Sequence, residues 1–380
     1  MQVDPIASSD APAATLVFMP RNSLKGRGTA WAIEHRFTSE QHLSVDDGWG
    51  TLEQAAREES VAPETQIIEQ RVKSILAGNE SPDIPFDLSI NPYRGCEHGC
   101  VYCFARPTHS YLNLSPGLDF ETKIIAKVNA AQRLREAFSA RSYEPLPLNI
   151  GSATDAYQPA ERRLRITRSL IEVLAEYRHP FSIITKSSGI ERDIDLLGPL
   201  AQERLAAVYL SIPTLDRALA RVMEPRATAP ERRLRTIERL ARAGIPVGVS
   251  VSPIIPFLNE PELEQVLERA RDAGATTAFS TVLRLPWEVN PLFQQWLQTH
   301  FPDRAARVMA RVRDLRGGRD NDSRFGQRMS GQGVWAQLLA QRFQNATRRL
   351  GLNSQRIALD LSSFRRYSDG ASTLVQPSLF

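Results

Sequence analysis

Short apolar runs alternate with longer amphipathic segments from residue 86 onward. Six of these runs are rich in β-branched and aromatic residues and bounded by turn residues, as expected for buried strands. The runs are Phe86–Ile90, Leu148–Gly151, Phe181–Thr185, Val208–Ile212, Val247–Ser252 and Ala278–Leu283. Apolar residues recur at helical spacing in Glu121–Ala140, Ala160–Tyr177, Ile194–Arg204, Pro230–Ala243 and Pro261–Ala273. The alternation predicts βα units and a parallel sheet.

The length of the repeat distinguishes between barrel types. Successive runs lie about 35 to 40 residues apart, as in the βα units of a barrel, but a full eightfold barrel needs about 250 residues, more than this stretch provides. We therefore expect an α/β fold built on an incomplete, six-stranded (β/α)6 TIM-type barrel over residues 86–290.

The flanking segments have different patterns. Residues 1–85 contain clusters of proline, glycine and polar residues, which predicts a partly irregular N-terminal extension with one short helix near residues 52–59. The pattern of residues 291–367 predicts a C-terminal helical extension, which includes a helix over residues 334–350. Residues 368–380 are expected to form a flexible tail.

Composition limits the class of protein. The chain has 380 residues, of which 42% are hydrophobic, enough to bury a substantial core. It has no apolar run long enough for a membrane span and no basic leader, so we expect a cytoplasmic protein.

The charge is mildly basic, with 47 lysines and arginines against 43 acidic residues. Arginines recur at helical spacing at positions 232, 235, 239 and 242, and again at 304, 307 and 311. Binding of nucleic-acid phosphates is one interpretation of this pattern. The solvated outer face of a barrel helix is the other.

The only three cysteines, Cys96, Cys100 and Cys103, lie within one short window. Thiolates at this spacing can bind three irons of a [4Fe-4S] cluster and leave the fourth iron open, while Gly95 and Gly99 let the backbone turn tightly. A zinc site is the alternative. It would need a fourth ligand, for which only the histidines at positions 98 and 109 are near.

The window resembles the cluster loop of the radical S-adenosylmethionine (SAM) superfamily, with Tyr102 as the aromatic residue before the third cysteine. Further segments resemble the spore photoproduct lyase-like branch of that superfamily. They are Asn91–Phe104, Thr154–Glu161, Thr185–Lys186, Glu224–Ala227 and Leu283–Glu288. The resemblance implies a [4Fe-4S] cluster, bound SAM and reductive cleavage of SAM to a deoxyadenosyl radical.

Polar residues at the carboxyl ends of the expected strands are candidates for binding the cofactor. In the family, the second strand end binds the methionine amino group, which points to Ser152, Thr154 and Asp155. Capping of the next helix competes for the same side-chain oxygens. The family resemblance assigns Lys186 to the cofactor carboxylate, although a lysine at the barrel rim can also extend to solvent.

Three more candidates complete the expected cofactor site. They are Tyr102 in the cysteine window, Ser211 at the end of the fourth strand, and Arg226 shortly after it. Arg226 could pair with a carboxylate or a substrate phosphate, or form an internal ion pair with Glu224.

The resemblance implies an enzyme that takes electrons from a donor such as flavodoxin or ferredoxin and acts on nucleic acid, as in DNA repair. No cysteine remains as a hydrogen donor once three bind iron, so direct lesion reversal would need a tyrosine such as Tyr93, Tyr157 or Tyr209. Two alternatives stay open: a radical SAM enzyme that modifies a protein, RNA or a metabolite, and a non-catalytic iron–sulfur protein that binds nucleic acid.

The last five residues, Gln376 to Phe380, resemble the peptide that docks on the bacterial sliding clamp. A short apolar anchor on a flexible segment is typical of such peptides. Pro377 departs from the pattern, and an incidental apolar end is the alternative interpretation.

Overall fold

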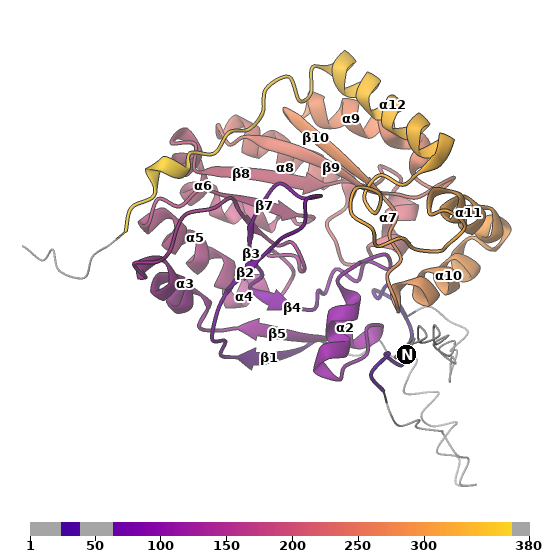
Figure 1. Cartoon of the computed structure of the whole chain (residues 1–380), viewed down its shortest axis with the longest axis horizontal. Coiled ribbons are helices and arrows are strands. Elements are labelled where there is room, and N and C mark those ends of the chain that lie inside the picture. The colour runs from indigo at the N-terminus through magenta and orange to yellow at the C-terminus, as the bar shows by residue number, and fades with distance from the viewer. Residues whose placement is uncertain (1–23, 39–63, 367–380) are drawn as a thin grey trace, which may run out of the picture.

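The computed structural model describes residues 24–38 and 64–366, and a seven-stranded sheet lies at its centre (Figure 1). Six strands run parallel, in spatial order along the chain: β3 (Leu88–Ile90), β6 (Leu148–Ile150), β7 (Phe181–Thr185), β8 (Ala206–Ser211), β9 (Val247–Ile254) and β10 (Thr277–Val282). The seventh, β2 (Leu76–Gly78), pairs antiparallel with β3. The sheet therefore has one strand more than the expected six, and the addition lies in the segment expected to be irregular.

The sheet does not close into a full barrel among the described residues. Strands β2 and β10 are its two edges. Residues 319–332 lie beside β10, where the Val282 amide donates to the Met329 carbonyl at 2.9 Å. Arg328 of this segment pairs with Asp83 in the loop after β2. The 319–332 segment thus links the two edges of the sheet.

Helices cover the parallel strands and bury their apolar faces against them. They are α3 (Ala130–Ser139), α4 (Glu161–Leu164), α5 (Ile166–Glu176), α6 (Ile194–Gln202), α8 (Pro230–Arg242) and α9 (Leu263–Asp272). Helix α7 (Arg217–Met223) belongs to a second hydrophobic core. The 3-10 turns are η1 (Arg106–Leu112), η2 (Ser188–Asp193), η3 (Glu260–Glu262) and η4 (Leu361–Ser363). Ile150, Ile183 and Val208 in neighbouring strands are fully buried, which explains why the strands read as continuous apolar runs.

Most of the regularly spaced arginines of helix α8 form ion pairs. Arg232 and Arg239 both pair with the Glu191 carboxylate, and Arg242 pairs with Glu238 on the same helix. Three of the four spaced arginines therefore have carboxylate partners, as expected for the polar outer face of a barrel helix rather than for a phosphate-binding stripe.

The expected helix over residues 121–140 is wrong in its first half. The chain forms α2 (Leu118–Thr122), then strand β5 (Lys123–Lys127), and only then α3. Strand β5 pairs parallel with β1 (Gln66–Gln70) and antiparallel with β4 (Tyr93–Arg94) in a separate three-stranded sheet. Two consecutive isoleucines and partners on both sides favour the strand, because sheet formation depends on packing more than on local propensity.

The C-terminal part is helical, with α10 (Val289–His300), α11 (Pro302–Leu315) and α12 (Gly333–Leu350). Helix α12 packs on α9 (Figure 1), where Arg342 binds the carboxylates of Glu260 and Glu264. None of the helices among the described residues is both long and apolar enough to cross a membrane. The helix expected near residues 52–59 and the clamp-like tail lie outside the described residues.

Candidate functional site

The cysteine loop, residues 95–104, lies between β4 and η1. Cys96 and Cys100 are buried and Cys103 is half-buried. The Cys96 amide donates to the Phe120 carbonyl at 2.9 Å, and the Val101 amide donates to the Met223 carbonyl at 3.1 Å. The loop is thus fixed on one side by α2 and on the other by α7.

Two glycines let the loop turn where no other residue fits. Gly95 and Gly99 have φ angles of 80° and 67°, in the left-handed region. A Cβ at Gly99 would lie 2.7 Å from the Glu121 carboxylate, so that position also lacks space.

A buried ion pair supports the loop, and the sequence interpretation missed it. Arg106 donates from Nε to the Cys100 carbonyl at 2.9 Å and from Nη2 to Glu121 at 2.5 Å. Glu121 also accepts the amides of Gly28 at 2.8 Å and Thr29 at 3.1 Å. The N-terminal segment and the cysteine loop therefore share one buried carboxylate, a long-range arrangement with no local sequence signal.

Burial favours the neutral thiol form of Cys100 and Cys96. Burial raises the pKa of Cys100 to about 12, although the Lys186 ammonium acts in the opposite direction. Burial also raises the pKa of Cys96, and Asp155 and the other two thiols add to the effect. Thiolates at these positions therefore need a metal centre to stabilise them, since metal coordination deprotonates thiols.

The three thiols match the number of protein ligands that a [4Fe-4S] cluster with one open iron needs. A zinc ion needs a fourth ligand. His109 Nε2 lies 3.1 Å from the Lys123 carbonyl and His98 Nδ1 lies 3.3 Å from Asp155 Oδ2, while His109 Nδ1 is buried without a hydrogen-bond partner among the described residues. Among those residues, no three His, Cys, Asp or Glu side chains are arranged to hold a single metal ion.

Asp155 joins the ends of β6 and β7. It accepts the Thr185 hydroxyl at 2.7 Å and the Lys186 amide at 2.8 Å. Burial alone would raise its pKa, but His98, the Lys186 amide and Thr185 hold that pKa well below its usual range. Asp155 is therefore a carboxylate. Its contacts are with the end of β7 and the turn at Tyr157, not with the first amides of α4 as the capping alternative requires.

Thr154 and Ser152 support the loop from the end of β6. The Thr154 hydroxyl donates to the Gly95 carbonyl at 2.6 Å and accepts Gln158 Nε2 at 3.1 Å. The Ser152 hydroxyl accepts Asn91 Nδ2 at 3.2 Å and is half-buried. Thr154 thus positions the backbone before Cys96.

Lys186 is a half-buried cation beside the thiols, and it has no ion-pair partner in the described part of the chain. Its Nζ lies 6.0 Å from the Tyr102 ring centroid. Burial lowers its pKa, but Cys100 and Glu224 outweigh that effect and raise the pKa above the usual value. Lys186 is therefore charged.

Tyr102, Glu224 and Arg233 form a buried chain. The Tyr102 hydroxyl donates to Glu224, which pairs with Arg233. Arg233 also donates from Nη1 to the Ser211 carbonyl at 2.7 Å. Ser211 itself is buried at the end of β8, with its hydroxyl 3.5 Å from the Ser252 carbonyl.

Arg226 does not form the ion pair with Glu224 that was its alternative interpretation. It pairs with Glu97 in the cysteine loop at 3.1 Å and donates to the Thr65 hydroxyl at 3.1 Å. Its amide donates to the His98 carbonyl at 3.3 Å. Arg226 therefore contacts the cysteine loop. The ion-pair partner of Glu224 is Arg233 on helix α8.

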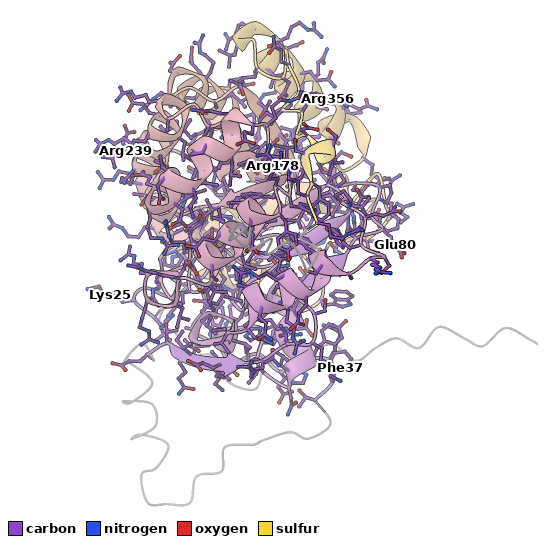
Figure 2. The ribbon with its side chains drawn as sticks, turned by 90° about the vertical axis from the view of Figure 1, so that its left-hand side faces the viewer. Lys25, Phe37, Glu80, Arg178, Arg239 and Arg356 are labelled. Carbon is purple, nitrogen blue, oxygen red and sulfur yellow. The ribbon has the colours of Figure 1, made fainter. Side chains whose placement is uncertain are left out.

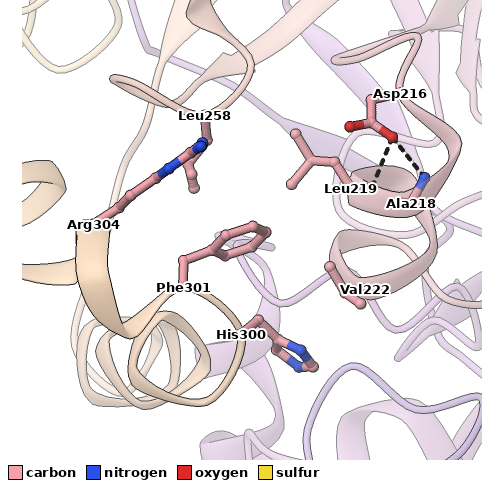
Figure 3. Close-up of a pocket in the computed structure, with 8 residues that line it drawn as sticks. All are labelled: Asp216, Ala218, Leu219, Val222, Leu258, His300, Phe301 and Arg304. Atoms are coloured by element: carbon pink, nitrogen blue, oxygen red, sulfur yellow. Dashed lines mark hydrogen bonds between the residues drawn. The ribbon is translucent and has the colours of Figure 1, made fainter.

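A separate pocket of about 240 Å³ lies between α7 and the junction of α10 and α11 (Figure 3). Its apolar wall includes Leu219, Leu258 and Phe301, and Arg304 lies at one side. None of the thiols or Lys186 lines it, and the Asp216 carboxylate at its edge caps α7. This pocket is distinct from the cysteine loop.

Comparisons with known proteins agree with this arrangement. The family model described as the radical SAM superfamily matches residues 90–270. An uncharacterized protein of Mycobacterium tuberculosis is 36% identical over 234 residues, which cover 61% of this chain and 68% of that protein. An uncharacterized protein of Methanocaldococcus jannaschii is 27% identical over 198 residues, covering 52% of this chain and 71% of that protein.

Two solved structures of spore photoproduct lyase share the fold. A mutant form superimposes with a TM-score of 0.54 at 16% identity, covering 75% of this chain and 80% of that one. The complex with a dinucleoside spore photoproduct gives a TM-score of 0.52 at 14% identity, with the same coverage.

Proposed function

Because this chain belongs to the radical SAM superfamily, whose enzymes use a [4Fe-4S] cluster and SAM, we propose that Cys96, Cys100 and Cys103 hold the cluster and that the chain cleaves SAM reductively. When bound, the reduced cluster supplies one electron that breaks a carbon–sulfur bond of SAM. The protein contributes binding, orientation and exclusion of water.

Lys186 is the residue we assign to the cofactor carboxylate. Its side chain is half-buried, and its ammonium is charged and without an ion-pair partner among the described residues, next to Cys100. A carboxylate here would neutralise it by a charge-assisted hydrogen bond. Asp155 and Ser152, at the neighbouring strand end, are the acceptors nearest in the fold for the cofactor amino group.

The remaining candidate residues fix the position of the cysteine loop through hydrogen bonds and ion pairs. Tyr102, through Glu224 and Arg233, links the cysteine loop to α8 and the end of β8. Thr154 and Arg226 bind the loop backbone through Gly95 and His98. We therefore assign Tyr102, Thr154, Ser211 and Arg226 to positioning the loop.

One observation carries the proposal: the only three cysteines of the chain lie on one loop beyond the carboxyl end of the first parallel strand, two of them buried and one half-buried. In barrel enzymes this end of the sheet holds the active site.

Anaerobic reconstitution with iron, sulfide and a chemical reductant tests the proposal. We expect cluster absorption and release of methionine and 5′-deoxyadenosine from SAM. Cys100→Ala should abolish both because it removes one of three iron ligands. Ser169→Ala on α5, whose hydroxyl bonds only within its helix, is the matched control and should retain both. Cluster formation without SAM cleavage would instead support a non-catalytic iron–sulfur protein.

The target we propose is nucleic acid, as in DNA repair. The shared fold with spore photoproduct lyase and the basic charge, 47 lysines and arginines against 43 acidic residues, support it. Radical SAM enzymes need an electron donor, and a flavodoxin or ferredoxin fits that role. Retention of the protein on DNA that weakens with salt would distinguish this target from a small metabolite.

The hydroxyls of two candidate hydrogen donors are engaged elsewhere. The Tyr93 hydroxyl donates to Glu161 and the Tyr157 hydroxyl to Asp193 at 3.0 Å, and both rings are buried. Tyr209 packs on Phe279 in the sheet. The Tyr102 hydroxyl is engaged as well, because it donates to Glu224.

A further inference from the structure

Three exposed aromatic rings surround one arginine beside the site. Phe37, Tyr111 and Trp287, here called the ring cluster, are 52%, 68% and 63% exposed. The guanidinium carbon of Arg36 lies 4.6, 5.1 and 4.5 Å from their respective ring centroids. Figure 2 shows Phe37 at the outer surface. A contiguous exposed patch of large rings marks an interaction surface more often than isolated apolar residues do.

Arg36 holds the rings but is not itself a free charge. Its Nη1 donates to both oxygens of Glu288 at 3.0 Å, and its amide donates to the same carboxylate at 3.1 Å. Glu288 is buried and also accepts the Ser110 hydroxyl at 3.4 Å. The guanidinium is therefore neutralised and fixed, and its position among the three rings keeps them in place.

Trp287 is presented by a strained backbone. Its φ of 45° is in the left-handed region, which side chains with a Cβ rarely adopt. The next residue, Glu288, is anchored on Arg36, which helps to hold the turn. Observed backbone strain of this kind is concentrated at functional positions.

The ring cluster lies close to the cysteine loop. Trp287 follows the carboxyl end of β10, and Tyr111 belongs to η1, whose Arg106 donates to the Cys100 carbonyl. Phe104, directly after Cys103, is a fourth exposed ring, 50% accessible. A ligand on these rings would therefore lie beside the proposed cluster.

Arg284 supplies the charge that the ring cluster lacks. Its guanidinium carbon lies 5.4 Å from the Phe104 ring centroid. Burial lowers the pKa of Arg284. Its Nε is buried and has no hydrogen-bond partner among the described residues. No carboxylate of the described residues lies within ion-pair distance of its guanidinium. A fixed arginine beside an exposed ring matches a phosphate next to a base.

We propose that the ring cluster, Phe104 and Arg284 bind an unpaired stretch of DNA, with bases stacked on the rings and a phosphate on Arg284. The inference rests on the proposed nucleic-acid target. It favours an unpaired strand because the base faces of a duplex are already stacked on one another. Stacking on aromatic rings does not depend on the hydrogen-bonding edge of a base, so we expect little preference for the sequence of the strand.

Fluorescence anisotropy on anaerobically reconstituted protein tests the surface, with a labelled single strand of about 12 nucleotides. We expect the single strand to bind more tightly than the duplex of the same sequence. Trp287→Ala should weaken it by about five- to hundredfold, while Trp287→Phe retains most of the affinity. Arg284→Gln should reduce the slope of log affinity against log salt by about 0.7.

Val334→Ala is the matched control, because Val334 is exposed on α12, which carries none of the four rings, and the affinity of this variant should not change. Iron content and circular dichroism identify variants that fail to fold. Equal or better binding of the duplex, preference for RNA of the same sequence, or an unchanged affinity in Trp287→Ala would overturn the proposal. SAM cleavage measured in parallel without DNA separates failure of this surface from failure of the proposed chemistry.

Discussion

Buried charges around the cysteine loop occur in pairs that tie it to other parts of the chain. Arg106 pairs with Glu121 and Arg233 with Glu224, and all four side chains are fully or almost fully buried. Removing one partner of such a pair leaves an uncompensated buried charge, which costs about 3 to 5 kcal/mol. These pairs favour one conformation of the loop, whereas Lys186, which we propose binds the cofactor, has no such partner among the described residues.

Replacing Lys186 by methionine should weaken the cofactor site selectively. Methionine keeps most of the buried volume but removes the charge, and a hydrogen bond to a charged group contributes about 1.5 to 3 kcal/mol. We expect KM for SAM to rise about ten- to hundredfold in cleavage assays, with iron content unchanged.

The surface ion pair between Lys123 and Asp119 offers a control. Lys123→Met removes a half-exposed lysine of the same chain and should leave KM as it was. Loss of iron from Lys186→Met, or a KM equal to that of the unaltered protein, would contradict the assignment of Lys186 to the cofactor.

Sequence reasoning identified the residues of the site whose pattern is local. The three cysteines and their glycines are adjacent in the chain, and their spacing carries the chemistry. It did not identify the Tyr102–Glu224–Arg233 chain, because Arg226 lies closer to Glu224 in sequence while α8 brings Arg233 to it in space. Partners of buried charges are set by helix packing and are not visible in short motifs.

At the scale of elements, apolar runs anticipated all six parallel strands, whereas segments in the second sheet were missed. Parallel strands covered on both faces read as continuous apolar runs, so their pattern is strong. Strand β5 lies between two helices, and its five residues extend the helical periodicity of its neighbours. Strand β2, three residues long, has almost no pattern of its own.

The 319–332 segment depends on its contact with the loop after β2. Arg328 donates to Asp83 and to the Ser81 hydroxyl, and the Gly326 amide donates to Asp83 at 2.7 Å. Arg328→Ala should therefore increase local opening, and limited proteolysis should cut within residues 319–332 several times faster.

Arg324→Ala is the comparison for that experiment. Arg324 belongs to the same segment but pairs with Asp322, two residues away, so its removal leaves the contact between segments in place. Equal cleavage rates in the two variants would show that the Asp83 contact does not hold the segment.

At the scale of the whole molecule, an aromatic cluster ties the last described residues to the first half of the α/β domain. Phe364, after η4, packs against Phe138 of α3 and against His179 before β7. His179 stacks on Phe138 with a centroid distance of 4.7 Å and is fully buried. The last described residues are thus held on the helical layer by ring contacts.

Acid should destabilise the fold through His179. Burial lowers the pKa of His179 to about 4, although a hydrogen bond to the Pro180 carbonyl opposes the effect. The unfolded chain, with a pKa near 6.5, binds the proton first, so stability is unaffected above about pH 6.5 and falls as the pH drops toward 4. The full loss is about 3 kcal/mol.

Urea unfolding at pH 7 and pH 4.5 measures this loss. His179→Gln cannot take up the proton and should show a smaller fall in the free energy of unfolding between the two pH values. The pKa of His109 is lowered to about 4 by burial as well, so the unaltered protein and His179→Gln both keep that contribution. An identical fall in the two proteins would exclude His179 as the cause.

The Glu121 carboxylate has a consequence for where the functional unit begins. The family match starts at residue 90, and the parallel strands start at Leu88. Yet the amides of Gly28 and Thr29 satisfy two acceptor positions of Glu121, beneath the loop that bears the thiols. In a fragment limited to the residues of the family match, the buried Glu121 carboxylate would lose the hydrogen bonds from Gly28 and Thr29. Each lost hydrogen bond would lower the free energy of unfolding by about 1 to 3 kcal/mol. The smallest fragment that can hold the proposed metal centre therefore includes the segment around Gly28 and Thr29, which lies outside the family match.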